Sequence, residues 1–543
     1  MRFPHALTLP PSGWPLAGLM AFYALAGLFG HDPWKSGDVI HLAIARDFLE
    51  GTALSLPLTG GSTPAAPLYY WSAALTGKLF SGILPLHDAM RLASGLWTAL
   101  TLLALYHAGR EQYGRESAAA TSLLLAGSLG FLIRAHEAQP LLTLVAALCI
   151  ALWAATRLPR KPRTALCWMG IALIMAGLGS DLAGLFLLLF VCLALLFLAW
   201  QERRGRMFLC GIAIASLLVL AWLPGRLGDP LLFATGVPHY LRNLGDFLLL
   251  LPWFSWPLLP LAGWSLWLRR RQLSAFSPAF LSLWALVFLL LLLPLFFPAA
   301  EATAMLLLPP LALLATPGTL ALRRGAANAF DWFSSMAFSV FALLLWVGWS
   351  AMIFGWPRRL AERAVELEPG FVGRFEFSLF ALALLVTLWW LWNLTTLPRS
   401  PYRSLVRWTT GLTVVWVLAA FLWLPWIDYG KSYRGLAARL VGEIPVDARG
   451  CVLAWRLGRA QRASLIYFER LTLMPLAAHD ATAPAACRWL ITQGVPRVET
   501  VPPAPPGATW QRVWEGQRPG DRRERFRLYQ LRRASRPVIS NEK

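Results

Sequence analysis

Three short clusters of polar side chains interrupt an otherwise apolar chain, and they are where chemistry could take place. The first contains Asp38 and His41, preceded by His31, Asp32 and Lys35. A carboxylate in such surroundings can act as a general base or orient an acceptor hydroxyl. Asp38 also precedes an amphipathic stretch, so a helix-capping role accounts for it equally well.

The second cluster is a run of hydrogen-bonding side chains between two apolar segments. It consists of Arg134, His136, Glu137 and Gln139. Two interpretations stay open: ordinary polarity at a membrane surface, or a contribution to the same site as Asp38.

The third cluster contains His239 and Arg242. The two side chains share one side of the segment if it is helical, because residues three apart are neighbours on a helix. The guanidinium of Arg242 has two-pronged donors that suit a phosphate group. Gly-rich phosphate loops, Ser/His/Asp sets and metal-binding helix motifs are absent from the sequence.

The elements that must position these clusters are membrane helices. Of the 543 residues, 57% are hydrophobic and only 14% are charged, against ~25% charged in an average soluble chain. So few polar residues cannot cover a soluble protein of this length, and so many apolar ones exclude a disordered chain. The composition predicts a polytopic, all-α membrane protein.

Thirteen segments are apolar and approach the ~20 residues that a membrane helix needs. They are 13–30, 89–108, 117–133, 139–156, 164–180, 182–200, 207–224, 246–268, 274–296, 302–322, 331–355, 375–394 and 408–425. We expect the first to be a retained helix rather than a cleaved signal peptide, since its flank is rich in proline and has a single arginine.

The net charge of +21 is explained by topology better than by a nucleic-acid partner. Every second loop is short and basic, and six such loops hold seventeen Lys and Arg residues. The alternate short loops contain only one basic residue, Arg134. Because cytoplasmic loops collect Lys and Arg, the N-terminus is predicted to be cytoplasmic and the C-terminus outside. The large outer loop 31–88 contains two amphipathic stretches, at 38–50 and 67–81, of the kind that lie along a membrane surface.

The last part of the chain, 426–543, is more polar than the rest and is predicted to form a small α/β domain outside the membrane, next to a transmembrane domain at 1–425. A helix is expected at 431–444 and strands at 450–455, 463–469, 487–492, 510–516 and 525–531. Cys451 and Cys487 each begin a predicted strand. In an oxidising compartment they either form a disulfide or remain two buried thiols.

The order of several motifs resembles the bacterial family of GT-C-type membrane glycosyltransferases. This family includes the lipid A aminoarabinose transferases and is related to the protein O-mannosyltransferases (families 39 and 83). The resemblance is carried by an acid before a short helix, by Pro67-Leu-Tyr-Tyr-Trp, by Arg91-Leu-Ala-Ser, by Leu251-Pro-Trp253 and by Leu308-Pro-Pro-Leu. It implies the thirteen-helix GT-C plan with an extracytoplasmic C-terminal domain.

The resemblance also implies a reaction. A sugar carried on a polyprenyl phosphate, such as undecaprenyl phosphate, would pass with inversion to a lipid, glycan or protein acceptor on the periplasmic side of the bacterial inner membrane. Asp38 would be the catalytic acid or base. Residues expected to bind substrate are His41, Arg46, Tyr69, Tyr70, Arg134, His136, Glu137, His239 and Arg242. A divalent metal is compatible with the resemblance, and no other cofactor is indicated.

The match is not complete. One acid of the family's Asp-Glu pair is kept as Asp38, and its usual Tyr becomes His41. The Glu and Lys before the Pro-Leu-Tyr-Tyr-Trp segment are missing, the acid of the second loop falls at Gln139, and Glu301 stands where a lysine and tyrosine are expected. These departures fit a branch with other sugars or an inactive relative. The alternative function is a non-catalytic membrane protein, either a lipid or sugar transporter or a subunit for envelope assembly.

Overall fold

A computed structural model shows how these segments fold. It describes residues 13–34, 36–54, 67–115, 117–180, 240–270, most of 283–291, 300–476 and 487–533. The described chain forms two compact units. Unit 1 consists of residues up to Phe29, Pro64–Trp349 and Phe375–Trp423, and unit 2 of Gly30–Thr63, Ser350–Arg374 and Leu424–Lys543.

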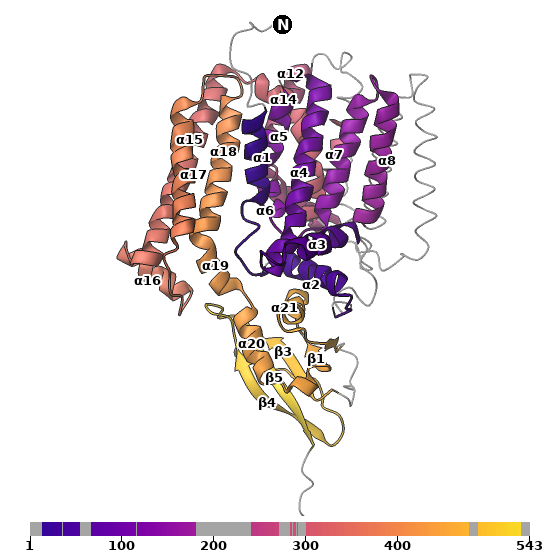
Figure 1. The fold of residues 1–543 in the computed structure, drawn as a ribbon, viewed down its shortest axis with the longest axis vertical. Helices are drawn as coiled ribbons and strands as arrows, with labels where there is room; N and C mark the ends of the chain where they lie inside the picture. Colours follow the sequence, from indigo (N-terminus) through magenta and orange to yellow (C-terminus); the bar gives the residue numbers. More distant parts are fainter. Residues whose placement is uncertain are drawn as a thin grey trace, which may run out of the picture. The chain divides into compact units, whose positions relative to one another are not determined.

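Unit 1 is a bundle of helices, and Figure 1 shows its longer helices running roughly side by side. Its described helices are α1 (Trp14–Leu25), α3 (Pro67–Phe80), α4 (Leu86–Tyr113), α5 (Ala118–Ala126), α6 (Leu129–Ala135), α7 (Leu141–Arg157), α8 (Pro162–Gly179), α11 (Tyr240–Phe254), α12 (Leu258–Arg269), α14 (Ala300–Leu320), α15 (Arg324–Phe354), α17 (Phe377–Thr396) and α18 (Arg403–Leu418). The last turn of α15 belongs to unit 2.

Six helices in the described part of the chain are long and apolar enough to cross a membrane. The number is eight if each of two bent pairs, α5 with α6 and α11 with α12, forms one span. The expected spans at 13–30 and 139–156 coincide with the shorter apolar helices α1 and α7. Those expected at 182–200 and 207–224, and most of 274–296, lie outside the described residues. The prediction of a polytopic helical membrane protein is confirmed.

The bend of 71° between α5 and α6 has a clear physical cause. A Cβ at Gly127 would lie 2.9 Å from both the Trp408 and the Thr409 side chains, so only glycine lets α18 approach this closely. The indole N–H of Trp408 donates to the Gly127 carbonyl at 2.7 Å. This satisfies a carbonyl that the broken helix leaves open, as a membrane interior requires.

Unit 2 gathers three stretches that are far apart in the sequence. The first provides α2 (Ser36–Glu50), and the second provides α16 (Arg358–Leu367). The third provides α19 (Leu424–Lys431), α20 (Arg434–Gly442) and α21 (Arg459–Glu469), together with a mixed five-stranded sheet. Helices α2 and α21 pack directly against each other.

The sheet has the order β2-β1-β3-β5-β4, with strands β1 (Val452–Trp455), β2 (Leu473–Pro475), β3 (Trp489–Gly494), β4 (Ala508–Gly516) and β5 (Arg525–Arg533). Strand β1 pairs in parallel with β2 and β3, whereas β5 pairs antiparallel with β3 and β4. Figure 1 shows α20 and α21 beside this sheet. The predicted C-terminal α/β domain is therefore present.

One predicted strand is wrong: residues 463–469 lie in α21, which begins at Arg459. The buried run from Ala463 to Tyr467 was interpreted as a strand, but it continues a polar helical turn that begins four residues earlier. The short strand β2 that follows was not predicted. Cys451 and Cys487, just before β1 and β3, have Cα atoms 5.1 Å apart and are joined by a disulfide.

Candidate functional site

The candidate catalytic residue, Asp38, lies in the first turn of α2. The helix begins two residues earlier, at Ser36, so Asp38 is not its N-terminal cap. Asp38 is almost completely buried, with 1% of its surface exposed. A carboxylate removed from bulk water in this way is suited to proton transfer, because its interactions are less screened than those of a surface acid.

His41 lies three residues after Asp38 and therefore on the same side of α2. Burial, and to a smaller extent Arg459 on α21, lower the pKa of His41 from its usual 6.5 to about 4, although Asp38 opposes both effects. At neutral pH the ring is consequently uncharged. It can donate or accept a hydrogen bond, but it cannot neutralise a phosphate.

Arg46 joins the end of α2 to α21. Its Nε lies 2.9 Å from Glu50, and its guanidinium also donates to the backbone carbonyl of Tyr467. The guanidinium carbon lies 5.5 Å from the centre of the Tyr467 ring, and Glu50 forms a second ion pair with Arg470. These contacts hold the C-terminal end of α2 on α21.

A second set of contacts holds the chain just before α2. The Asp32 backbone N–H donates to Asp428 at 2.8 Å. The Asp32 carboxylate accepts from Ser432 at 2.7 Å and from Arg434 at 2.9 Å. Because Asp32 precedes α2 and Arg46 lies near its end, the helix that presents Asp38 is fixed on both sides within unit 2.

In unit 1, a chain of hydrogen bonds connects Tyr69 on α3 to the loop that contains Glu137. The Ser94 hydroxyl donates to the Glu137 backbone carbonyl at 2.7 Å. Since Ser94 has only one proton, the Tyr69 hydroxyl, 2.7 Å away, donates to Ser94. Tyr70 packs its ring edge-on against Tyr69, and both rings are buried.

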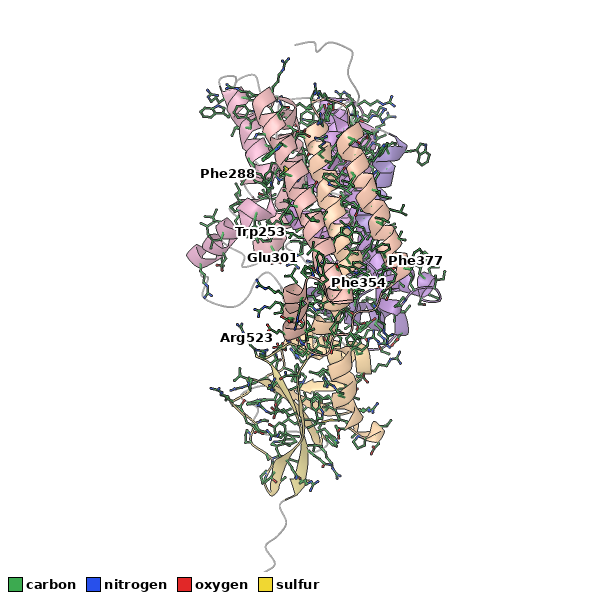
Figure 2. The ribbon with its side chains drawn as sticks, turned by 90° about the vertical axis from the view of Figure 1, so that its left-hand side faces the viewer. Trp253, Phe288, Glu301, Phe354, Phe377 and Arg523 are labelled. Carbon is green, nitrogen blue, oxygen red and sulfur yellow. A yellow bond between two sulfur atoms is a disulfide. The ribbon has the colours of Figure 1, made fainter. Side chains whose placement is uncertain are left out.

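Arg134 bridges two acids in unit 1. Its guanidinium lies 3.0 Å from the Glu137 carboxylate and forms a second ion pair with Glu301 at the start of α14. Glu137 is buried, with 4% of its surface exposed, whereas the Glu301 side chain is 56% exposed. Glu301 is labelled in Figure 2. The arrangement links the loop after α6 to α14.

His136 is buried between three helices of unit 1. One ring nitrogen lies 2.7 Å from the Leu132 carbonyl, and the other lies 2.6 Å from the Tyr23 carbonyl on α1. The ring also packs against Trp416 at a centroid distance of 5.0 Å. Both nitrogens therefore face backbone acceptors, an arrangement that positions the loop carrying Glu137.

The third predicted cluster is described only in part. Arg242 lies exposed in the first turn of α11, and His239 lies outside the described residues. Within the described part of the chain, no three His, Cys, Asp or Glu side chains are arranged to hold a metal ion.

Comparison with known proteins supports the resemblance. Residues 63–224 match the family described as dolichyl-phosphate-mannose-protein mannosyltransferase. The crystal structure of ArnT from Cupriavidus metallidurans bound to undecaprenyl phosphate aligns with a TM-score of 0.61 and 16% identity, covering 95% of this chain and 96% of that one. The resemblance to GT-C-type membrane glycosyltransferases is confirmed. The apo form of the same ArnT aligns with a TM-score of 0.56, and no curated protein matches the chain in sequence.

Several residues that hold the candidate residues in place were not assigned a role from the sequence. Ser94 was noted only as the last residue of the Arg91-Leu-Ala-Ser motif and was given no role, because one serine on an apolar helix does not indicate its partners. Glu301 was noted only as a departure from the family pattern, and its pairing with Arg134 spans 167 residues. The partners of Asp32 lie about four hundred residues away. Local spacing cannot show such contacts.

Proposed function

We propose that the chain is an integral membrane glycosyltransferase that moves a sugar from a polyprenyl-phosphate donor to a lipid, glycan or protein acceptor on the periplasmic side. The observation that carries the proposal is the ArnT-like fold over 95% of the chain. The family match supports it, since residues 63–224 include α3, α4 and the loop with Glu137. The ArnT that aligns with the chain was crystallised with undecaprenyl phosphate, which makes this lipid the first donor carrier to test.

In the proposed reaction Asp38 is the catalytic base. Its carboxylate accepts the proton of an acceptor hydroxyl as the oxygen attacks the anomeric carbon of the sugar. The bond from that carbon to the phosphate oxygen breaks, and polyprenyl phosphate leaves with the electron pair. Attack from the side opposite the phosphate inverts the anomeric centre.

The remaining predicted residues are proposed to bind the substrates. Arg242, with His239, would hold the phosphate, whose negative charge grows as the sugar leaves. Arg134 and Glu137 would contact the polar part of the donor or acceptor. His41 would contribute as an uncharged ring, because its pKa of about 4 keeps it neutral in the periplasm. Arg46, Tyr69, Tyr70 and His136 would shape the site.

We further propose the complete topology. Thirteen spans with a cytoplasmic N-terminus would place residues 31–88 and 426–543 in the periplasm of a bacterium, with the protein in the inner membrane. The seventeen basic residues in alternate loops support this orientation. Modification of lipid A or of another envelope glycan is the biological role that the ArnT-like fold favours.

The experiment that tests the proposal compares two conservative variants on the same helix, Asp38→Asn and Asp47→Asn. Purified protein is incubated with radiolabelled sugars on undecaprenyl phosphate and with a membrane extract as the acceptor. Native mass spectrometry of added undecaprenyl phosphate reports binding separately. We expect Asp38→Asn to bind the lipid as the wild type does and to lose transfer at least a hundredfold, while Asp47→Asn retains it.

Two results would contradict the proposal. Transfer by Asp38→Asn at the wild-type rate would refute the role of Asp38. Binding of the lipid by the wild type without transfer from any donor in the panel would favour the non-catalytic alternative, a transporter or an assembly subunit.

A further inference from the structure

Helix α16 has an apolar side that no other described part of the protein covers. None of its ten residues is buried. Leu360, Ala364 and Leu367 follow the i, i+4, i+7 spacing of one helix face, and Val365 lies beside them. The exposed fractions are 47% for Leu360, 58% for Val365 and 47% for Leu367. In a soluble protein, leaving such a face exposed to water would be strongly unfavourable in free energy.

The opposite side of α16 is charged, and four of its five charged side chains form ion pairs. Arg358 forms an ion pair with Glu362 at 2.8 Å, and Arg363 forms one with Glu366 at 2.7 Å. Both pairs connect positions three or four apart on the helix. The helix therefore has little net charge with which to attract an acidic or basic partner.

The position of α16 in the chain indicates what lies against its apolar side. The candidate span α15 ends at Phe354, and α16 begins at Arg358. Four extended residues reach at most about 14 Å, so α16 must start close to the membrane surface. The next candidate span, α17, begins at Phe377.

The flanking residues are those of a membrane interface. Phe354, Trp356 and Phe377 are 63%, 69% and 73% exposed, and Figure 2 labels the two phenylalanines. Exposed aromatic rings at the ends of spans are typical of the boundary between headgroups and acyl chains. The chain on both sides of α16 thus carries the aromatic residues expected where a span meets the membrane surface.

The segment after α16 is attached to the rest of unit 2. The Tyr429 hydroxyl donates to the Pro369 carbonyl at 3.1 Å, and the Tyr429 ring meets Phe371 edge-on. The Glu368 side chain lies against Gly430 and Gly520, where a Cβ would come within 2.1 Å and 2.5 Å of it. These contacts attach α16 to α19 and to the loop before β5, so a binding interaction of α16 also restrains those two segments.

We propose that α16 lies in the plane of the bilayer surface with Leu360, Val365 and Leu367 among the lipid acyl chains. The occupant of its apolar face is the lipid itself, and because four of the five charged side chains are paired, zwitterionic lipid is sufficient. Through the contacts of Glu368, Pro369 and Phe371, α16 ties the start of the C-terminal domain to the membrane surface. This proposal is independent of the transferase activity.

The test places a fluorescent label on each side of α16 in the full-length protein. The cysteines at 149, 167, 192 and 210 are replaced by alanine, and the Cys451–Cys487 disulfide is kept. Leu360→Cys and Leu367→Cys report the apolar side, and Arg359→Cys and Glu366→Cys are matched controls on the charged side. Each variant carries an environment-sensitive dye in nanodiscs of phosphatidylcholine. Lipids with a nitroxide in the acyl chain, and iodide in the water, serve as quenchers.

We expect the leucine positions to be quenched several-fold more by the lipid nitroxide than the control positions, with iodide giving the reverse order. Adding anionic phosphatidylglycerol or raising the salt should leave this contrast unchanged. Equal quenching by iodide on both sides would refute the proposal. Protection of the leucine positions from both quenchers would also refute it, because a second copy or another protein would then cover the face.

Discussion

Acidification should lower the stability with which α2, the helix that carries Asp38, packs in unit 2, because His41 titrates. The pKa of His41 is lowered to about 4 in the folded chain, from 6.5 in the unfolded one. Above pH 6.5 both states hold the neutral ring, so stability is complete. As the pH falls below 6.5 the unfolded state takes up a proton that the folded state refuses, and stability is lost until about pH 4.

The magnitude follows from the two pKa values. A tenfold difference in protonation corresponds to about 1.4 kcal/mol, so the complete loss below pH 4 is about 3 kcal/mol. At pH 5 about 2 kcal/mol of this stabilisation should already be lost. This free energy concerns the packing of α2 against α21, because His41 lies on α2 and Arg459 on α21.

The assay is hydrogen exchange measured by mass spectrometry on peptides from α2 and α21, between pH 7.5 and pH 5 and corrected for intrinsic exchange rates. The wild type is compared with His41→Gln, which keeps a hydrogen-bonding side chain without a titration in this range. Protection of α2 should fall roughly thirtyfold more in the wild type than in the variant. Arg459→Gln, at an exposed position, should give a smaller acid effect, because Arg459 helps to lower the pKa. An equal acid response in the wild type and His41→Gln would show that the reasoning is wrong.

Two further predictions concern the bridges within each unit. The disulfide of Cys451 and Cys487 closes a loop of 36 residues, so replacing both by serine should cost about 4 kcal/mol and sensitise the C-terminal domain to protease. Replacing the free Cys149 by serine is the control for thiol chemistry, and detection of two free thiols by mass spectrometry would end the argument. In unit 1, Ser94→Ala should lower the stability of the folded protein by about 2 kcal/mol, because Ser94 makes hydrogen bonds with both Tyr69 and the Glu137 carbonyl. Tyr69→Phe removes only the hydrogen bond between Tyr69 and Ser94 and should cost about 1 kcal/mol. Adding Tyr69→Phe to Ser94→Ala should then cost little more in thermal inactivation, and fully additive losses would contradict the hydrogen-bond chain.

The apolar periodicity was sufficient to predict most of the described spans, because a bilayer demands a long run of apolar residues whatever their packing. It did not show that the segment 117–133 is broken. The break depends on Gly127 and on Trp408 of a different helix, and neither is visible in a hydropathy pattern.

In the C-terminal domain, the sequence pattern did not distinguish a helix from a strand. Residues 463–467 are buried in a continuous run, which suits a strand and a buried helix equally well. Packing of α21 against α2 decides in favour of the helix. Short runs of β-favouring residues between Pro and Gly turns were a better guide to β4 and β5.

For the candidate site, the sequence indicated the residue types but not their connections. Arg134, His136 and Glu137 were grouped because they are adjacent, and the structure indeed involves all three in positioning one loop. Arg46 was expected to bind substrate. Its contacts with Glu50 and Tyr467 give it a positioning function that only the folded chain reveals.

The assembly of unit 2 from distant stretches has a consequence for synthesis. Asp32 and its partner Arg434 are 402 residues apart. At about 5–20 residues per second, α2 emerges about 20–80 s before the segments that hold it. During this interval the growing chain carries α2 before the segments that pack against it in the folded protein have been made. A chain that stops before α20 should be degraded rather than retained as a partly active enzyme. The structure of α2, within the first fifty residues, thus depends on contacts with roughly the last hundred residues.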